Sequence, residues 1–178
     1  AYTSLALDAS NHPHISYYDI TNGDLKYAHW DGANWSTQII DSGGDVGKYT
    51  SLTLNDADQP QVAYYDVTNA DLKFAAWSGT AWNIVTVDST GDVGSFASLA
   101  LNAADVPYIS YYDASNQDLK LAYWTGADWS TETVVSTGDV GQYTSLAFDK
   151  YEYPNISYYN ATDDLLNYTY WTYEGWET

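Results

Sequence analysis

The chain has 178 residues, enough for one domain with a sizeable core, and nothing in its composition indicates a second domain. It has no Cys and no Met, which excludes disulfides, Cys-based metal sites and thiol chemistry. Its 24 acidic residues face five Lys and no Arg, so we expect neither nucleic acid nor an anionic membrane as a partner, because both bind through basic surfaces.

The sequence also predicts no insertion into a membrane. No apolar run approaches the roughly 20 residues that cross a bilayer. The first residues already follow the pattern of the whole chain and carry no signal peptide, so we expect any export signal to have been removed or to lie outside these residues.

The main feature of the sequence is a tandem repeat with a period of 47 residues. Internal repeats of this length indicate solenoids, propellers or arrays. The repeat holds without a gap in all four Pro, in the Tyr-Tyr pair that begins at Tyr17, and in two ladders of Trp. These ladders are Trp30, Trp77, Trp124 and Trp171, and Trp35, Trp82, Trp129 and Trp176.

In chain order, the first repeat predicts four strands, over residues 4–8, 14–19, 25–30 and 35–41. These segments are rich in Tyr, Trp, Ile, Val and Thr, and clusters of Gly, Asn, Asp and Pro separate them. No helical periodicity of 3.6 residues competes with this pattern. The same segments recur in the later repeats, but the fourth ends soon after Gly175, before most of its outermost strand.

Four antiparallel strands in about 47 residues match one blade of a β-propeller, a radial arrangement that protects sheet edges. We therefore predict an all-β fold, a single β-propeller domain over residues 1–178 with an incomplete last blade. The first strand of each repeat has small or modest residues, which suit the innermost position. Tyr17 and Tyr18 point to opposite faces of their strand and are expected to pack in different seams. The expected blades are 1–47, 48–94, 95–141 and 142–178.

Three Gly-Asp-Val-Gly turns connect the repeats, and with propeller wiring they lie on an acidic face. Carboxylate and backbone oxygens are the ligands of Ca²⁺, so Asp45, Asp92 and Asp139 are candidate calcium ligands. The alternative is that each Asp only caps a glycine turn.

The recurring Ser-Tyr-Tyr-Asp, Asp-Leu-Lys-Tyr-Ala and Gly-x-x-Trp elements resemble those of propeller-forming secreted and cell-surface proteins of bacteria and archaea. The resemblance covers essentially the whole chain and implies an extracellular, lectin-like propeller. Residues 90–96 and 137–143 are similar to the Asp-box of sialidase-like propellers, although the aromatic residue comes one position early and the element joins two blades. An Asp-box is a folding turn, and sialidase-like activity needs an arginine cluster that this chain lacks.

Aromatic faces stack on the apolar faces of sugars, so the second Trp ladder provides candidate carbohydrate-binding residues. Trp35, Trp82, Trp129 and Trp176 open the outermost strands beside polar turns. Packing in the seams between blades is the alternative role for these side chains, and the expected role for the Tyr pairs.

Four Asn-x-Ser/Thr sequons give candidate glycosylation sites, three of them in the fourth repeat. They begin at Asn34, Asn155, Asn160 and Asn167. His12 and His14 could offer two imidazoles to a metal, but no third ligand accompanies them.

Three functions follow, in order of preference. The first is a non-catalytic extracellular binding or adhesion module that binds glycans at repeated sites, with Ca²⁺ as an optional ligand. The second is a structural subunit of a surface layer or filament, in which the incomplete last blade contacts another copy. The third is a glycoside-active enzyme, which would need a carboxylate pair that breaks the repeat; we do not expect an enzyme.

Overall fold

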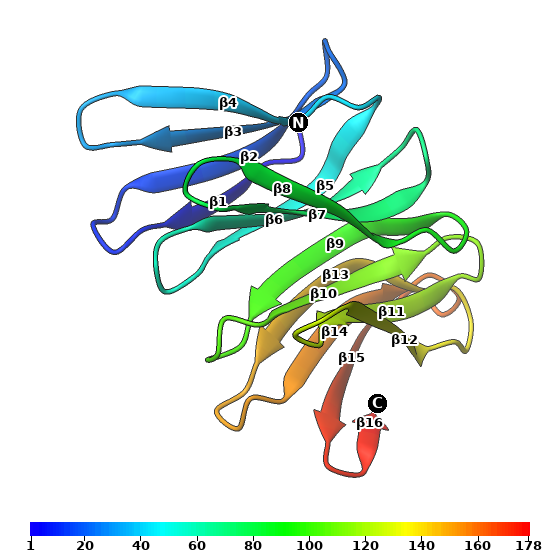
Figure 1. The fold of residues 1–178 in the computed structure, drawn as a ribbon. Coiled ribbons are helices and arrows are strands. Elements are labelled where there is room, and N and C mark those ends of the chain that lie inside the picture. Colours follow the sequence, from blue (N-terminus) through cyan, green and yellow to red (C-terminus); the bar gives the residue numbers. More distant parts are fainter.

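The computed structural model describes all 178 residues and consists of β-strands joined by turns. They form four four-stranded antiparallel sheets, each in sequence order, as the repeat predicts. Figure 1 shows the sheets following one another along an arc, with the N-terminal and C-terminal sheets at its two ends. We call these sheets blades 1 to 4.

In blade 1 the strand bounds agree with the predicted ones to within a residue, whereas the first strands of blades 2, 3 and 4 begin five residues earlier than the repeat predicts, at Val46, Val93 and Val140. Their first residues also pair with the second strand of the blade, across a bulge that the sequence did not reveal. The chain contains no helix of the length and apolar character that crossing a bilayer requires. The strands are β1 (Ser4–Leu7), β2 (Pro13–Asp19), β3 (Asp24–Trp30), β4 (Trp35–Asp41), β5 (Val46–Leu54), β6 (Pro60–Asp66), β7 (Asp71–Trp77), β8 (Trp82–Asp88), β9 (Val93–Leu101), β10 (Pro107–Asp113), β11 (Asp118–Trp124), β12 (Trp129–Val135), β13 (Val140–Phe148), β14 (Pro154–Asn160), β15 (Leu165–Thr172) and β16 (Gly175–Glu177).

The first strand of each blade lies innermost, as predicted. β5 packs beside β1 and β9, and β9 packs beside β13, so these strands line the inside of the arc (Figure 1). The outermost strand of blade 4, β16, has three residues where β4, β8 and β12 have seven each. The last blade is therefore the incomplete one, in agreement with the sequence.

The core is divided into three apolar clusters, one for each seam between neighbouring blades. Each seam is closed by a glycine in the strand that enters the next blade. A Cβ on Gly94, for example, would lie 2.7 Å from the Cα of Leu72 in the preceding blade, and the φ of Gly94 is 107°. Only glycine permits this approach and this backbone conformation together.

The Tyr-Tyr pairs serve two seams, as their alternation predicts. The Tyr64 hydroxyl donates to Asp41 of blade 1 at 2.6 Å, whereas the neighbouring Tyr65 hydroxyl donates to Asp92, at the entry to blade 3, at 2.7 Å. One dipeptide therefore connects its blade to both neighbours.

A buried charge cluster lies in each of the first two seams. In the seam of blades 2 and 3, Asp88 accepts hydrogen bonds from Tyr111 at 2.7 Å and from Lys120 at 2.5 Å. Burial raises the pKa of the Asp88 carboxyl, but the bonds from Lys120 and Tyr111 outweigh it and leave the pKa below its usual value. The seam of blades 3 and 4 replaces this acid and Lys by Val135 and Asn167.

This natural replacement gives a stability prediction. Asp88→Val alone removes the nearer of the two acids that face the buried Lys120, the other being Asp113 at 4.0 Å, and should lower the free energy of unfolding by about 3 kcal/mol. The triple variant Asp88→Val/Asp113→Asn/Lys120→Asn reproduces Val135, Asn160 and Asn167 of the next seam and should come within about 1 kcal/mol of the unchanged chain. Urea unfolding followed by Trp fluorescence measures both. Equal losses in the single and triple variants would contradict the argument.

Candidate functional site

Three pockets of similar size lie in the three seams, at equivalent positions of the repeat. Their volumes are about 300 Å³ between blades 1 and 2, about 280 Å³ between blades 2 and 3, and about 290 Å³ between blades 3 and 4. All three are open to solvent beside the turns that precede β6, β10 and β14. The earlier blade gives one side of each pocket and the later blade gives a Pro and a Trp, namely Pro60 and Trp77, Pro107 and Trp124, and Pro154 and Trp171.

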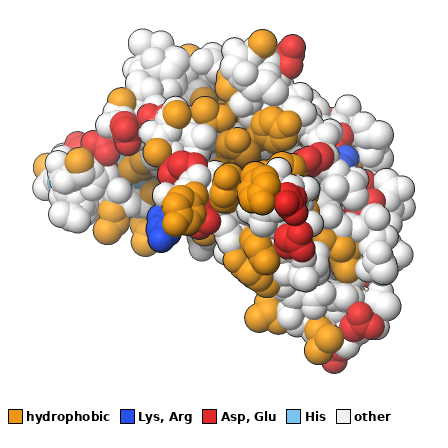
Figure 2. Space-filling model, turned by 90° about the horizontal axis from the view of Figure 1, so that it is seen from below, with side chains coloured by type: hydrophobic (Ala, Val, Ile, Leu, Met, Phe, Trp, Pro, Cys, Tyr) orange, Lys and Arg blue, Asp and Glu red, His pale blue; other side chains and the backbone are white.

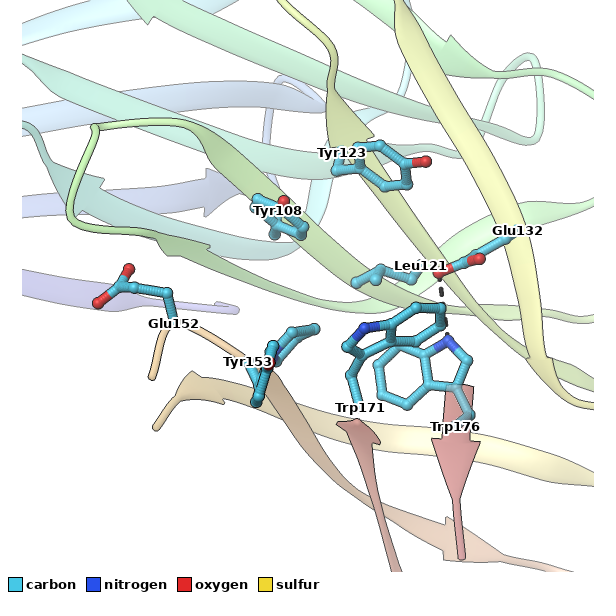
Figure 3. Close-up of a pocket in the computed structure, with 9 residues that line it drawn as sticks. Tyr108, Leu121, Tyr123, Glu132, Glu152, Tyr153, Trp171 and Trp176 are labelled. Carbon is cyan, nitrogen blue, oxygen red and sulfur yellow. Dashed lines mark hydrogen bonds between the residues drawn. The ribbon is translucent and has the colours of Figure 1, made fainter. Parts of the chain in front are cut away.

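The pocket between blades 3 and 4 has the most aromatic lining, and Figure 3 shows it in close-up. Trp171 and Trp176 lie side by side below Leu121, with ring centroids 5.5 Å apart (Figure 3). Tyr108 and Tyr123 stack on the opposite side, with centroids 5.4 Å apart. The arrangement gives a sugar ring aromatic faces and phenol groups in one cavity.

The pocket between blades 2 and 3 is the most apolar, with Phe74, Val85, Trp124 and Trp129 around it. Gln61, on β6, contributes an amide side chain to this pocket. Its buried Oε1 atom accepts no hydrogen bond within the chain. A buried acceptor without a donor is costly, so this oxygen is suited to a hydroxyl from a ligand.

The pocket between blades 1 and 2 is polar and contains two of the three His. His14 and His29 stack with centroids 5.6 Å apart, and the buried ring of His14 is hydrogen-bonded to the Tyr27 hydroxyl. Burial lowers the pKa of His14, and the proximity of His29 adds to the effect. His14 is therefore uncharged at neutral pH, and the pocket presents a neutral hydrogen-bonding group.

The candidate Trp ladder is distributed over the seams. Trp82 packs edge-on against Tyr27 of the preceding blade and donates from Nε1 to Gln38 at 3.1 Å. Trp129 lines the second pocket and Trp176 the third, whereas Trp35 is 52% exposed on the side of blade 1 that faces away from blade 2. Trp129 and Trp176 thus both pack in a seam and line a pocket, Trp82 packs in a seam alone, and sugar binding by any of the four stays a prediction.

Sequence reasoning did not single out the other Trp ladder or the repeated Pro as pocket residues. Both follow the same 47-residue period, so the signal was present. The pocket also depends on which face of β3, β7 or β11 a residue occupies, and on the turn of the next blade. That combination is set by packing between blades.

The candidate calcium ligands lie at the opposite ends of the strands, away from the pockets. Asp45, Asp92 and Asp139 each accept a Tyr hydroxyl at 2.7 Å, and backbone bonds from the same loops tie neighbouring blades together. No group of three or more His, Cys, Asp or Glu side chains is arranged to hold a metal ion. The carboxylates thus bond to side chains and not to the backbone of their own turns, where Gly43 N–H donates to Asp41 and Thr90 N–H to Asp88. Calcium binding stays a prediction.

These Tyr-Asp bonds lead to a prediction about alkaline pH. The bond to Asp45 raises the pKa of Tyr18 to about 12, and burial together with the bond to Asp139 raises that of Tyr112 to about 12. An unfolded Tyr loses its proton near pH 10, so the folded state is stabilised below that pH and loses this stability as the pH rises toward 12.

Urea unfolding between pH 9 and 12 tests this expectation. Tyr112→Phe should make the loss of stability with rising pH shallower, because one group with a shifted pKa is gone. Tyr173→Phe is the matched control, since Tyr173 is 84% exposed, and it should leave the pH dependence unchanged. An equal effect of both substitutions would contradict the assignment.

The sequons lie in different environments. Asn34 is exposed in the turn between β3 and β4, Asn155 and Asn167 are half-buried, and Asn160 is buried with its Nδ2 donating to Asp163 at 3.0 Å. Asn34 is therefore the sequon most open to a glycosyltransferase, and glycosylation at all four remains a prediction.

Two acids border the pocket between blades 3 and 4, and one of them, Glu132, breaks the repeat as a catalytic residue would, whereas Glu152 stands where the preceding repeats have Asp58 and Asp105. Glu132 accepts the Nε1 proton of Trp176 at 3.2 Å, and Glu152 accepts the Ala103 backbone N–H at 2.7 Å (Figure 3). The first bond repeats the Trp82 bond to Gln38. The second repeats the bonds of Asp58 and Asp105, which also accept a backbone N–H of the preceding blade. Both acids thus perform structural roles that recur in other seams.

No family model matches the chain, and no curated protein matches it. Solved structures of similar fold include the Aleuria aurantia lectin in complex with Fucalpha1-6GlcNAc, at 15% identity and a TM-score of 0.65, over 98% of this chain and 59% of the lectin. An ulvan lyase of a polysaccharide lyase family is similar at 14% identity and a TM-score of 0.68, over 98% of this chain and 56% of the lyase. A Dyadobacter fermentans protein of unknown function is similar at 10% identity and a TM-score of 0.71, over 100% of this chain and 68% of that protein.

The chain spans just over half the length of the lectin and the lyase. At these identities the similarity concerns the fold. Together with the four sheets in radial order, it defines an all-β tandem-repeat protein of the β-propeller class.

Proposed function

We propose that this protein is an extracellular carbohydrate-binding module that takes a neutral mono- or disaccharide unit in each of its three seam pockets. The observation that carries the proposal is the repetition of an open, aromatic-lined pocket at the same position in every seam. Volumes near 300 Å³ are at the lower end of the range for small-ligand pockets and suit one or two sugar rings.

The chemistry of the lining favours neutral sugars. The chain has no Arg, the residue that best recognises carboxylate and sulfate groups, and its net charge is −19. Figure 2 shows acidic side chains distributed over one face, between patches of apolar ones, with few Lys. Acidic glycans would be repelled from such a surface, whereas hydroxyl groups find amide, phenol and imidazole partners.

The three pockets are equivalent in position and different in lining. We expect different affinities, with the pocket of blades 3 and 4 the tightest because it has two Trp and three Tyr. Weak binding at each site would be raised by multivalency on a surface that carries many copies of the glycan.

A glycosidase is the second candidate, because Glu132 and Glu152 border one pocket. Its weakness is that both carboxylates already accept hydrogen bonds that hold the seam together. The assay is release of reducing sugar from the oligosaccharides that bind. Turnover that is lost in Glu132→Gln and Glu152→Gln would replace the binding proposal with a catalytic one.

The first experiment is a glycan array of neutral and acidic oligosaccharides, run with and without Ca²⁺. We expect binding to neutral glycans and none to sulfated or uronic-acid glycans. An array without any neutral hit would overturn the proposal.

Gln61→Met tests a single pocket. The substitution keeps the volume but removes the buried oxygen that has no donor, so the stability should be unchanged or slightly higher while sugar binding between blades 2 and 3 weakens on the order of tenfold. Calorimetric titration with a sugar from the array measures the affinity. Gln142→Met, on the face with Asp139, is the matched control and should bind as the unchanged chain does.

A further inference from the structure

Blade 1 has an exposed apolar side whose counterparts in the other blades are covered by the preceding blade. Leu5 is 63% exposed, whereas the equivalent Leu52, Leu99 and Leu146 are 6 to 7% exposed. This side, which we call the blade 1 flank, faces away from blade 2. It also includes Ile15, Tyr17, Ala28 and Trp35, which border one shallow apolar hollow.

On blade 4 the exposed side is the one that, in blades 1 to 3, packs against the next blade. Leu166 is 81% exposed, whereas the equivalent Leu25, Leu72 and Leu119 are completely buried under the next blade. Tyr168, Tyr170 and Leu166 lie on this side, which we call the blade 4 flank. In the three formed seams the position of Tyr168 is occupied by Tyr27, Phe74 and Leu121, all buried.

The two flanks are complementary because they are the two halves of a seam that the chain builds three times. In a formed seam the Trp of the later blade packs on the aromatic residue of the earlier blade, as Trp129 does on Phe74 with centroids 5.0 Å apart. Trp35 and Tyr168 are the corresponding residues without such a neighbour. The partner that fits one flank is therefore the other flank.

We propose that two copies of the chain associate head to tail, with the blade 1 flank of one copy on the blade 4 flank of the other, and that this contact completes a fourth sugar pocket. The contact is heterologous, so it continues the arc and joins different surfaces of the two copies. The fourth pocket rests on the function proposed above, whereas the association does not.

The blade 4 half of that pocket already has the geometry of a formed one. Tyr168 and Tyr170 stack with centroids 5.7 Å apart, and the Tyr168 hydroxyl donates to Asn155 Oδ1. The blade 1 half supplies Pro13 and Trp30, at the positions of the Pro and Trp in the other three pockets. Neither half encloses a cavity of the same kind alone.

Charge determines the conditions under which this contact forms. Each copy has a net charge of −19, so long-range repulsion opposes association. Leu, Ile, Tyr and Trp dominate the two flanks, and their burial is not weakened by salt. Association should therefore strengthen as ionic strength rises from about 10 mM to about 0.5 M, because salt screens the repulsion.

Sedimentation equilibrium of the 178-residue chain tests the association without any sugar. We expect a mass of at least twice the 19.8 kDa of one copy, in a concentration-dependent equilibrium. Leu166→Asp should weaken the association on the order of tenfold or more, because it buries a charge in the seam. Leu165→Asp is the matched control. The other three repeats have Asp at this position, and position 165 lies on the opposite face of the strand from Leu166, so the substitution should leave the mass unchanged.

A mixing experiment distinguishes this contact from a symmetric one. Leu5→Asp damages the blade 1 flank and Leu166→Asp damages the blade 4 flank, so neither variant should associate alone. Mixed together, each still has the flank that the other needs, and a one-to-one dimer should form. A strictly monomeric unchanged chain at millimolar concentration, or a variant that still dimerises alone, would overturn the proposal.

Sugar stoichiometry then tests the fourth pocket. The associated chain should bind more sugar per copy than the Leu166→Asp monomer, which keeps only the three pockets within the chain. Association with equal stoichiometry would refute the fourth pocket. An absence of sugar binding in both forms would refute the proposed function and leave the association standing.

Discussion

The structure depends on one constraint, which is that each blade can bury its two faces only against neighbouring blades. A four-stranded sheet of Tyr, Trp, Leu and Val has no second layer of its own. The core therefore consists of three seams. The close approach at Gly94 and the hydrogen bonds of Tyr64 and Tyr65, one to each neighbouring blade, hold the blades together at these seams. Stability in such an array is approximately a sum of contacts between neighbours, and in this structure the flanks of blades 1 and 4 are the apolar sides that no neighbouring blade covers.

The fold was predictable because the determining pattern is local and repeated. Strand segments, turns and the innermost position of β1 follow from residue types within one repeat. The local strain was not predictable: Tyr49, Phe96 and Tyr143 have φ between 52° and 56°, a conformation that a non-glycine residue rarely adopts. Their rings pack against one another along the inner strands, with centroids 4.5 and 4.3 Å apart and ring planes tilted by 49° and 50°. Packing between blades holds this bulged backbone, and no single repeat reveals it.

The pockets were only half predictable, for the same reason. The residues on both sides of a pocket are 20 to 68 positions apart in the chain, and they meet because one blade follows another. The sequence identified aromatic residues as candidate sugar contacts, and Trp129 and Trp176 do line pockets. It could not show that the same Trp would also close the seam. The same Trp side chain thus packs in a seam and lines a pocket. Substitution of a pocket Trp would therefore change stability and sugar binding together and could not distinguish the two effects.

This sharing of roles explains where the repeats agree and where they differ. Positions that close a seam are constant, such as the glycines and the Leu beneath them, because any change there would open the core. The pocket positions on the strands vary from blade to blade, as His14, Gln61 and Tyr108 show at a single position of the repeat. A scaffold that keeps the same glycine and Leu contact in every seam and varies the side chains that line the pockets is consistent with the proposed binding at several sites. A catalytic pair would require two acids free of structural duty, and in the most acidic pocket Glu132 and Glu152 both hold the seam.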